Sequence, residues 1–390
     1  MLSRGSRIWR HSTGRHPRFL GSSDRPSPAT GSAYHRSVTE ITGQSRAIER
    51  IFRVCRTTTA DALSLRLAVL DEIRRVVKFD AYAWLLTDPE TEVGSAPLAD
   101  VPCLPELPRL IRLKYLTPVN RWTQLDGPVA LLSVSTGDHL ERSLVWREML
   151  VRYGVTDVAS LVFRCRYGCW GFLDLWRCDA GGSFTDEEAD FLTAIAKPVT
   201  AALRRCQAST FSLAASATVR AGPVVLVLSP DLEVRAQTLE TNEYLKLLVP
   251  PDADRQPIPA GAYNVAAQLL SVEAGIDDHS PTARVHLSAG VWLTLRAARI
   301  GTASPTAEQE IAVAIEVAAP AERMALFGRA CALSTRELEL FGLLIVGFDT
   351  RRIAQQMFLS ENTVQDHLKS IFNKTETSNR RTLLARAVGH

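Results

Sequence analysis

The chain has 390 residues, of which 46% are hydrophobic and 22% are charged, and its formal net charge at pH 7 is +3. This length exceeds what one hydrophobic core usually organises, so we expect several domains, and no apolar run reaches the ~18 residues that a membrane span needs. The small net charge excludes a polycation, so any affinity for nucleic acid must come from a local patch.

The first segment, 1–45, is rich in Arg, Ser, Pro and Gly, and Asp24 is the only acid before the first glutamate at position 40. Such a segment cannot bury enough apolar surface to fold alone, so we predict a disordered basic tail. A transit peptide, a flexible arm that touches phosphates and an extension upstream of the true start are alternative interpretations. We assign the tail no function.

The next segment, 46–208, has the patterns of a mixed domain of helices and strands. Apolar residues at helical spacing predict two helices near its start. Alternating runs predict three strands, and a tight turn joins the last two. Thr185 and Glu188 form a capping box that starts a long closing helix. The predicted helices are 47–56, 61–79 and 183–207, and the predicted strands are 80–88, 157–165 and 170–177.

This order of elements resembles a GAF domain. The resemblance is carried by 158–202, which holds the strand Gly171–Leu175 and the run "FTDEE" before the last helix. It implies a sensory module that cups a small ligand or forms dimers. The resemblance does not name the ligand.

The segment 219–318 begins with a strand, a turn at Pro230 and Asp231, a second strand and a helix, and strand patterns return at 282–300 and 310–318. This order is similar to a PAS domain, which implies a second sensory module. The polar residues that hold haem or flavin in such domains are not recognisable in the sequence. We therefore expect no cofactor.

The last segment, 326–390, contains four helical patterns. A capping residue precedes each of the first three. Ser334 and Glu337 form a capping box, Asp349 or Thr350 caps the next helix, and Ser360 caps the one after it. We predict that the first two of these helices carry an inward apolar face made of Leu338, Phe341, Ile345, Ile353, Ala354 and Met357.

Three residues, 358–360, separate the second and third of these helices, which is the connection length of a helix-turn-helix. In the third helix Val364, Leu368 and Ile371 recur at helical spacing and must face the core. The opposite face is polar, and a helix of this kind has the right size to enter the major groove of duplex DNA. We therefore predict that this polar face contacts base edges.

Residues in 333–337, 353–375 and 379–387 closely resemble the LuxR-type, or GerE-type, helix-turn-helix family. The family pattern implies that the base-facing residues are Gln365, Asp366 and Lys369. It implies DNA phosphate contacts at Arg351, Arg352, Ser360, Thr363, Lys374 and Arg380. It also implies that the last helix is a dimerisation helix, with an interface made of Leu383, Leu384 and Val388.

Three positions in this segment raise questions. Thr335 stands where the family usually has proline, which slightly reduces pre-organisation of the first helix. Glu376 stands where the family often has glycine, and a left-handed conformation there would cost about 1 kcal/mol. Asp366 would be repelled by phosphates unless it accepts a hydrogen bond from a cytosine amino group. We therefore expect Asp366 to affect sequence specificity.

Other candidate sites have simpler interpretations. Cys165 and Cys169 flank a tight turn and could form a redox or metal switch, but packing is the simpler interpretation because no further Cys or His lies at ligand spacing. The chain has seven cysteines, an odd count that indicates reduced thiols in a cytosol. The aromatics of Tyr115–Trp122 could line a ligand pocket, although we favour packing in a core. The sequence contains no recognisable catalytic or metal-binding cluster.

The sequence thus predicts a multidomain α+β protein of the bacterial cytoplasm, in which GAF-like and PAS-like α/β sensor domains precede a four-helix LuxR-type domain. We expect a transcription regulator, not an enzyme, that binds double-stranded DNA as a homodimer through helix 361–374. Further expected partners are an unknown small-molecule or protein effector of the sensors and, as a candidate, RNA polymerase. The alternative is a ligand-binding or partner-binding sensor with a vestigial DNA-binding domain.

Overall fold

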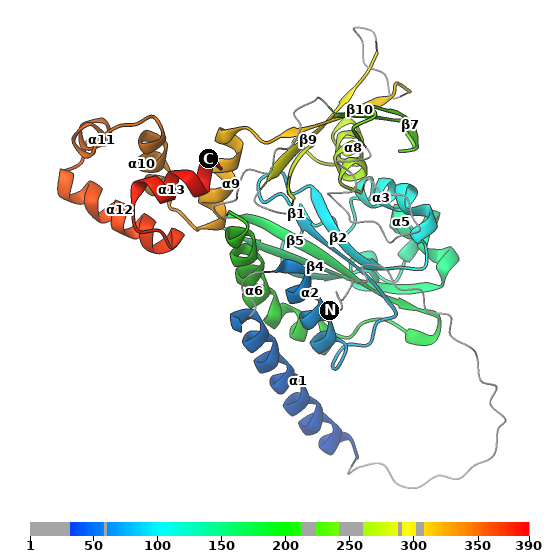
Figure 1. Cartoon of the computed structure of the whole chain (residues 1–390). Helices are drawn as coiled ribbons and strands as arrows, with labels where there is room; N and C mark the ends of the chain where they lie inside the picture. Colours follow the sequence, from blue (N-terminus) through cyan, green and yellow to red (C-terminus); the bar gives the residue numbers. More distant parts are fainter. Residues whose placement is uncertain are drawn as a thin grey trace, which may run out of the picture.

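A computed structural model of the chain describes residues 32–57, 61–211, 224–241, 260–287, 291–301 and 308–389. These residues form two antiparallel five-stranded sheets with their helices, followed by a helical C-terminal part (Figure 1). This architecture confirms the predicted multidomain α+β class. Within the described ranges, every helix is too short or too polar to pass through a bilayer.

Helix α1, Ser32–Thr57, is the first described element. Residues 32–45 were predicted to belong to the disordered tail, and that part of the prediction is wrong because they are helical. The rest of the predicted tail lies outside the described residues. The helix is explained by its C-terminal half, where Ala47, Ile51 and Cys55 are buried in the core. A helix anchored in this way extends at little cost towards its N-terminus, because propagation is far easier than nucleation.

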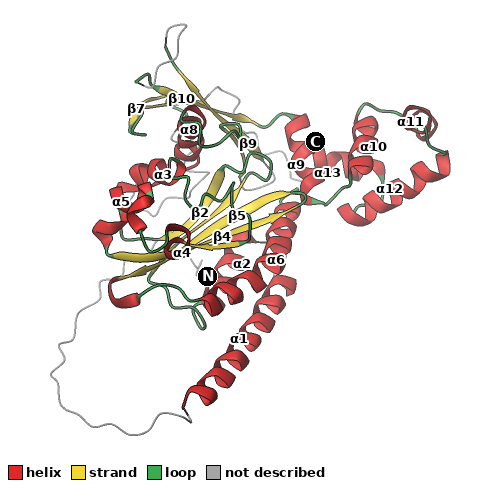
Figure 2. Cartoon of the chain, turned by 180° about the vertical axis from the view of Figure 1, so that it is seen from behind, coloured by secondary structure: helices red, strands yellow, loops and turns green. Residues whose placement is uncertain are grey.

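The first sheet has the strand order β2-β1-β5-β4-β3. Side chains alternate along β5, so that Leu173 and Leu175 pack into one core cluster and Phe172 and Trp176 pack into another. Both faces of the sheet are covered by helices, as Figure 2 shows. The strands are β1 (Ala81–Thr87), β2 (Gly94–Asp100), β3 (Val129–Leu131), β4 (Val155–Cys165) and β5 (Gly168–Cys178).

The two faces of this sheet carry different helices. Helices α1, α2 (Ala62–Ile73) and α6 (Asp186–Ser209) lie on one face, and α6 begins with the predicted capping box of Thr185 and Glu188. The other face is covered by short helices from the part of the chain between β2 and β4. These are α3 (Leu107–Tyr115), α4 (Leu132–Thr136) and α5 (Leu144–Glu148).

The cysteines of the β4–β5 hairpin do not face each other across the two strands. Cys165 is paired with Gly168, and Cys169 is paired with Arg164. Cys169 is fully buried, and this burial raises the pKa of its thiol to about 12. The arrangement favours packing over a redox switch, and all seven cysteines are free thiols.

The second sheet has the strand order β7-β6-β10-β9-β8, which is the same order as in the first sheet when strands are counted within each unit. Helix α8, Ala260–Glu273, packs against its strands and also against α3 of the first unit. The helix predicted directly after β7 falls largely on residues outside the described part. The strands are β6 (Val224–Leu228), β7 (Val234–Gln237), β8 (Thr282–His286), β9 (Trp292–Arg299) and β10 (Ile311–Val317).

The C-terminal part consists of five helices in the residues described from 308 onward. Four of them, α10 to α13, correspond to the predicted four-helix domain, and α9 precedes them. The helices are α9 (Pro320–Ala330), α10 (Thr335–Ile345), α11 (Thr350–Met357), α12 (Glu361–Thr375) and α13 (Arg380–Val388).

Buried charges tie the two sheet-containing units together. The carboxylate of Asp88, which follows β1, is fully buried and accepts hydrogen bonds from the backbone N–H, Nε and Nη2 of Arg284 in β8 at 2.7 to 2.8 Å. Arg121 donates to Asp277 Oδ2 at 2.7 Å and to Gln268 Oε1 at 2.9 Å. Pairs of this kind fix one relative position of the two units, since either partner alone would be a buried uncompensated charge.

We expect the substitution Asp88→Asn to lower the free energy of unfolding by about 3 kcal/mol. The buried Arg284 guanidinium would keep only the partly exposed carboxylate of Glu90, at 2.8 Å, as a counter-charge. Denaturant unfolding followed by tryptophan fluorescence measures this change. The matched control is Asp231→Asn, because Asp231 is 77% exposed and lies 3.6 Å from Arg112. The control should change stability by less than about 0.5 kcal/mol, and equal effects of the two substitutions would contradict this role of Asp88.

Candidate nucleic-acid interface

Local capping contacts set the boundaries of α10, α11 and α12. Ser334 accepts a hydrogen bond from the Glu337 N–H, and the Glu337 carboxylate accepts one from the Ser334 N–H, as the predicted capping box requires. Of the two candidates for the next cap, it is Asp349 that accepts from the Arg352 N–H, at 2.8 Å. Ser360 accepts from the Thr363 N–H at 3.1 Å. The three predicted helix starts are therefore confirmed.

The inward face of α12 is also confirmed, because Val364, Leu368 and Ile371 are buried. In α11 the predicted Ile353, Ala354 and Met357 are buried as well. The predicted face of α10 is wrong in part, since Ile345 is 37% exposed and Leu338 is half-buried. The buried face of α10 is made of Leu340, Phe341 and Leu344. This face is rotated about the helix axis from the predicted one, because it is the side on which α10 packs against α11 and α12.

The turn between α11 and α12 consists of residues 358–360, as predicted. Phe358 ends α11 in a left-handed conformation with φ of 56°, and its side chain is 94% exposed. Glu376 ends α12 in the same way with φ of 51°, which is the left-handed conformation that the sequence raised as a question. The strain there is offset by a hydrogen bond from the Thr377 N–H to the Phe372 carbonyl.

The three residues predicted to face DNA bases, Gln365, Asp366 and Lys369, are all exposed on α12. Lys369 Nζ lies 3.3 Å from Asp366 Oδ1, and both side chains are about three-quarters exposed, at 73% and 75%. Gln365 Nε2 donates to Thr350 Oγ1 at 3.3 Å. Figure 1 shows α11 and α12 at the end of the molecule that points away from both sheets, so this polar face is open to a large partner.

Most of the residues predicted to contact phosphates lie around the start of α11 and the start of α12. Arg351 and Arg352 are exposed, and the Arg352 guanidinium stacks 3.9 Å from the centre of the Phe348 ring. Arg380 Nη2 donates to Thr350 Oγ1 at 2.6 Å. Ser360 and Thr363 lie in the first turn of α12, whose N-terminus favours a negative group.

Lys374 differs from the other predicted phosphate residues, because its charge is already paired inside the domain. Its Nζ lies 2.6 Å and 2.9 Å from the two carboxylate oxygens of Glu337. Ser370 donates to the same carboxylate at 2.6 Å. Burial disfavours the charged form of Glu337, but the hydrogen bonds from Lys374, Ser370 and Ser334 outweigh it and lower the pKa of Glu337 to about 2. Lys374 therefore joins α12 to α10.

The predicted dimerisation residues fall into two groups. Leu383 is fully buried in the core of its own domain, so it is not available to a second copy in this conformation, and the prediction is wrong for this residue. Leu384 and Val388 are half-buried. Helix α13 packs on α9, where Arg323 donates to the carbonyls of Arg386 and Ala387. This non-local packing could not be seen in the spacing of α13.

The sequence patterns did not predict one group of functional interest. This group is the aromatic cluster around Phe211, which follows the end of α6. Phe211 is fully buried, stacks on Trp292 of β9 with a centroid distance of 5.0 Å, and meets Phe327 of α9 edge-on at 5.3 Å. Arg386 Nε donates to the Phe211 carbonyl at 2.8 Å, and Arg204 Nη1 donates to the Ala330 carbonyl at 2.7 Å. The cluster thus joins both sheet-containing units to the helical domain.

Within the described residues, one group of side chains has the spacing of a metal site, namely Asp277, Asp278 and His279. Asp277 already accepts hydrogen bonds from Arg121, Thr123 and His279, so its charge is compensated by the protein. Asp278 is fully exposed at 102%. This arrangement is explained by the structural ion pair with Arg121, and it does not require a metal.

Comparison with known proteins identifies the C-terminal domain. Residues 331–387 match the bacterial regulatory proteins of the luxR family, so this part of the chain is a LuxR-family, or GerE, domain. Such a helix-turn-helix domain is the DNA-binding part of a transcription regulator. No curated protein matches the chain.

Solved structures show only weak likenesses. The chromophore-binding domain of the bacteriophytochrome RpBphP3 from R. palustris has 16% identity and a TM-score of 0.28, and the match covers 44% of this chain and 62% of that one. Escherichia coli SdiA has 12% identity and a TM-score of 0.30, over 90% of this chain and 98% of that one. SdiA in complex with octanoyl-rac-glycerol has 11% identity and a TM-score of 0.27, over 93% and 96%. These TM-scores are too low to establish a shared overall arrangement.

We expect the substitution Glu337→Gln to destabilise the helical domain by about 2 kcal/mol at pH 7, because it removes the charge that holds Lys374. The pKa of Glu337, about 2, lies below its ordinary value of 4.5. Its contribution is therefore fully present above about pH 4.5 and is lost as the pH falls towards 2. Amide hydrogen exchange of α12 in the full chain, measured near pH 7 and near pH 3, reports the change.

The matched control for this prediction is Glu339→Gln on the same helix. Glu339 lies 2.7 Å from Arg336, but these side chains are 45% and 61% exposed, so the pair contributes little. We expect the control to match the wild type at both pH values. A difference between Glu337→Gln and the wild type that stays the same near pH 3 would contradict the role given to the carboxylate charge.

Proposed function

We propose that this chain is a transcription regulator that recognises specific duplex DNA sequences through α12, with Gln365, Asp366 and Lys369 contacting base edges in the major groove. The proposal rests on one observation. Helix α12 lies in a LuxR-family domain, its polar face is exposed, and its opposite face is buried in the core of that domain. An amide, a carboxylate and an ammonium group can together contact adenine, cytosine and guanine. Helices that read the major groove have this composition on their outer face.

We infer that Arg351, Arg352 and Arg380, together with the N-terminal turn of α12 at Ser360 and Thr363, bind the flanking phosphates. Arg352 and Arg380 are held by Phe348 and Thr350, so they lose little side-chain freedom on binding. Phosphate contacts fix the register of the reading helix without specifying sequence. Lys374 is excluded from this group because Glu337 already neutralises it.

We further propose that the regulator binds DNA as a homodimer. Two copies would place their α12 helices in successive major grooves, about 34 Å apart. Leu384 and Val388, which are partly exposed on α13, are the residues that we assign to the contact between copies. Leu383 is not part of this proposal because it is buried in its own domain.

We also propose that the two sheet-containing units, 46–208 and 219–318, act as sensors that control this binding, through an effector that is a small molecule or a protein. The contacts of Phe211 support the proposal, because they join α6 and β9 of these units to α9 and α13 of the DNA-binding domain. A change of the position of α6 would have to alter these contacts. A tenfold change of DNA affinity needs only about 1.4 kcal/mol of coupling.

We expect the substitution Lys369→Ala to reduce affinity for the preferred duplex about tenfold and to relax the choice of base at one position, because Lys369 is assigned to a base edge. Selection from a random duplex pool with the full chain identifies the preferred site. Fluorescence anisotropy over a series of salt concentrations then measures the affinity of each variant. Lys197→Ala, a change of an exposed lysine on α6, is the matched control and should leave both quantities unchanged.

The variant Arg351→Ala provides the contrast that a phosphate contact predicts. It should weaken binding to every duplex to a similar degree and reduce the slope of log affinity against log salt by about one. Arg351→Ala should thus weaken preferred and unrelated duplexes alike. If Lys369→Ala did the same, the assignment of α12 as the helix that recognises the sequence would fail.

We expect the substitution Phe211→Ala to loosen the DNA-binding domain from the sensor units, because it removes a buried ring with an expected loss of about 3 kcal/mol. Hydrogen exchange at α9 and α13 should become faster, while the recognition of the preferred duplex by α12 is retained. Phe52→Ala is the control, since Phe52 is 43% exposed on α1. Unchanged exchange at α13 in Phe211→Ala would show that the cluster does not hold the domain.

A further inference from the structure

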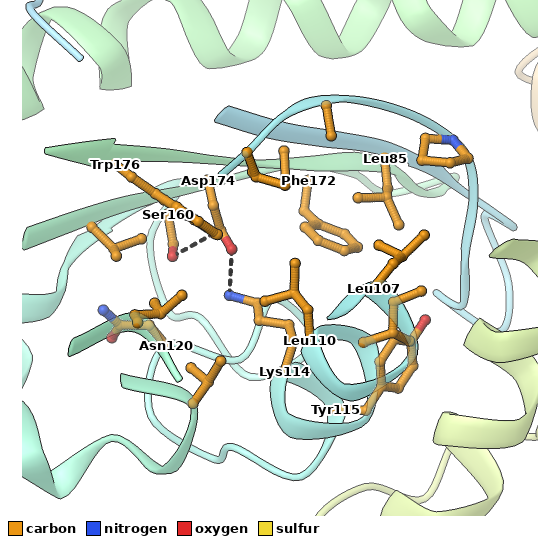
Figure 3. A pocket seen from close by; sticks show the side chains of 18 of the residues that line it. Leu85, Leu107, Leu110, Lys114, Tyr115, Asn120, Ser160, Phe172, Asp174 and Trp176 are labelled. Atoms are coloured by element: carbon orange, nitrogen blue, oxygen red, sulfur yellow. Dashed lines mark hydrogen bonds and ion pairs between the residues drawn. The ribbon is translucent and has the colours of Figure 1, made fainter. Parts of the chain in front are cut away.

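A cavity of about 80 Å³ lies in the first sheet-containing unit, between the sheet and α3 (Figure 3). Its walls are mainly apolar and include Leu85, Leu107, Leu110 and Phe172. Helix α8 of the second unit closes one side with Ala260 and Asn264. The cavity is therefore shared by both units that we propose as sensors.

The stretch Tyr115–Trp122, for which the sequence left a pocket wall and core packing open, does both. Tyr115, Val119 and Asn120 line the cavity. Trp122 is buried behind the wall and stacks on Phe172 with a centroid distance of 4.2 Å. The aromatic side chains thus give the cavity a rigid outer layer.

The charged groups in the wall are already paired with each other. Lys114 Nζ lies 2.7 Å from Asp174 Oδ2, and Ser160 Oγ donates to Asp174 Oδ1 at 2.7 Å, as Figure 3 shows. The pair has no net charge. A charged ligand would have to give up its hydration without meeting an uncompensated opposite charge. The cavity is therefore suited to an uncharged molecule.

Several polar atoms at the cavity are buried without a hydrogen-bond partner among the described residues. They are the indole N–H of Trp176, the amide nitrogen of Asn120 and both amide atoms of Asn264. Trp176 is 3% exposed and Asn264 is 1% exposed, so bulk water does not serve them. Buried donors in native proteins almost always have a partner. In Trp176 and Asn120 the buried atom without a partner is a donor nitrogen, which indicates that the missing group is an acceptor.

We propose that this cavity binds a small, uncharged and mainly apolar molecule that carries a carbonyl-type hydrogen-bond acceptor, with Trp176 and Asn120 as the donors to that acceptor. The volume of about 80 Å³ is roughly half of the 150 Å³ of a cavity known to hold benzene, so the part of the ligand that enters is only a few atoms in size. The inference rests on the proposed sensory role of these units. Asn264 extends it, because a ligand that reaches this amide contacts the two units at once.

Three probes of five non-hydrogen atoms each test the proposal with the full chain. They are 2-butanone, which has the carbonyl, 2-methyl-1-butene, which replaces it by an apolar group of the same shape, and propanoate, which replaces it by a charge. Saturation-transfer NMR titrations measure the affinity of each probe without DNA. We expect 2-butanone and 2-methyl-1-butene to bind and propanoate not to bind.

The substitution Trp176→Phe removes the donor and keeps an aromatic ring. It should weaken binding of 2-butanone about fivefold, the effect of one hydrogen bond, and leave binding of 2-methyl-1-butene within twofold. Trp84→Phe is the matched control, because the indole N–H of Trp84 is also buried and unpaired but belongs to the other core cluster, where the ring stacks on Phe163. This control should not change the affinity for either probe.

Two further variants keep the proposal testable if Trp176→Phe does not fold. Asn120→Gly removes the second donor at a position whose φ of 51° suits glycine, so it should also weaken 2-butanone alone. Ala99→Leu fills the cavity from β2 and should abolish binding of both uncharged probes. The proposal is overturned if no probe binds, if propanoate binds best, or if Trp176→Phe weakens both uncharged probes equally.

A gel shift of the same protein without any probe keeps this test separate from the proposed function. DNA binding that is normal in a protein that ignores the probes would reject the cavity ligand and leave the regulator intact. Loss of DNA binding in a protein that discriminates the probes as expected would reject the regulator and leave the ligand site intact.

Discussion

The packing of Phe211 is the contact on which the attachment of the helical domain to the two sheet-containing units depends. This one side chain, at the end of α6, touches Trp292 of the second sheet and Phe327 of α9, and its carbonyl accepts from Arg386 of α13. Each of the three units contributes a ring or a guanidinium, so the cluster exists only when all three are in place. The DNA-binding domain is therefore held by side chains of both sheet-containing units, while α11 and α12 extend away from them (Figure 1).

The sequence predicted those parts of the structure that local interactions determine. Ser334, Asp349 and Ser360 cap the helices next to them, and a cap needs only neighbours within three residues. The inward face of α12 follows from the spacing of Val364, Leu368 and Ile371, because a helix with one apolar face must bury that face. The exposure of Gln365, Asp366 and Lys369 follows from the same pattern.

What the sequence did not predict depends on contacts between distant segments. Leu383 looked available for a dimer, but α9 and the domain core cover it. Ile345 looked buried, but the neighbours of α10 lie against Leu344 and Leu340 instead. Lys374 looked free for a phosphate, yet its partner Glu337 is 37 residues away in the chain. Periodicity tells which side chains of an element share a face, and it does not tell which other element meets that face.

The division of cations between structure and surface explains how a chain with a formal net charge of only +3 can offer a face for DNA. Arg284, Arg121 and Lys374 are paired with Asp88, Asp277 and Glu337, so they fix the units and add no net charge. Exposed cations remain around α12, namely Arg351, Arg352 and Lys369. A local patch of this kind can bind phosphates although the rest of the molecule is nearly neutral, because charges beyond about 8 Å are largely screened at physiological salt.

A rigid attachment of the DNA-binding domain is compatible with control by a ligand, because the energies involved are small. A hydrogen bond such as that from Arg386 to the Phe211 carbonyl contributes about 1 kcal/mol, and a coupling of that size already changes an affinity about fivefold. A ligand between the first sheet and α8 would not need to unfold any element. It would need only to favour one position of α8 and β9, because β9 carries Trp292 against Phe211. A shift of that ring would then reach the helical domain.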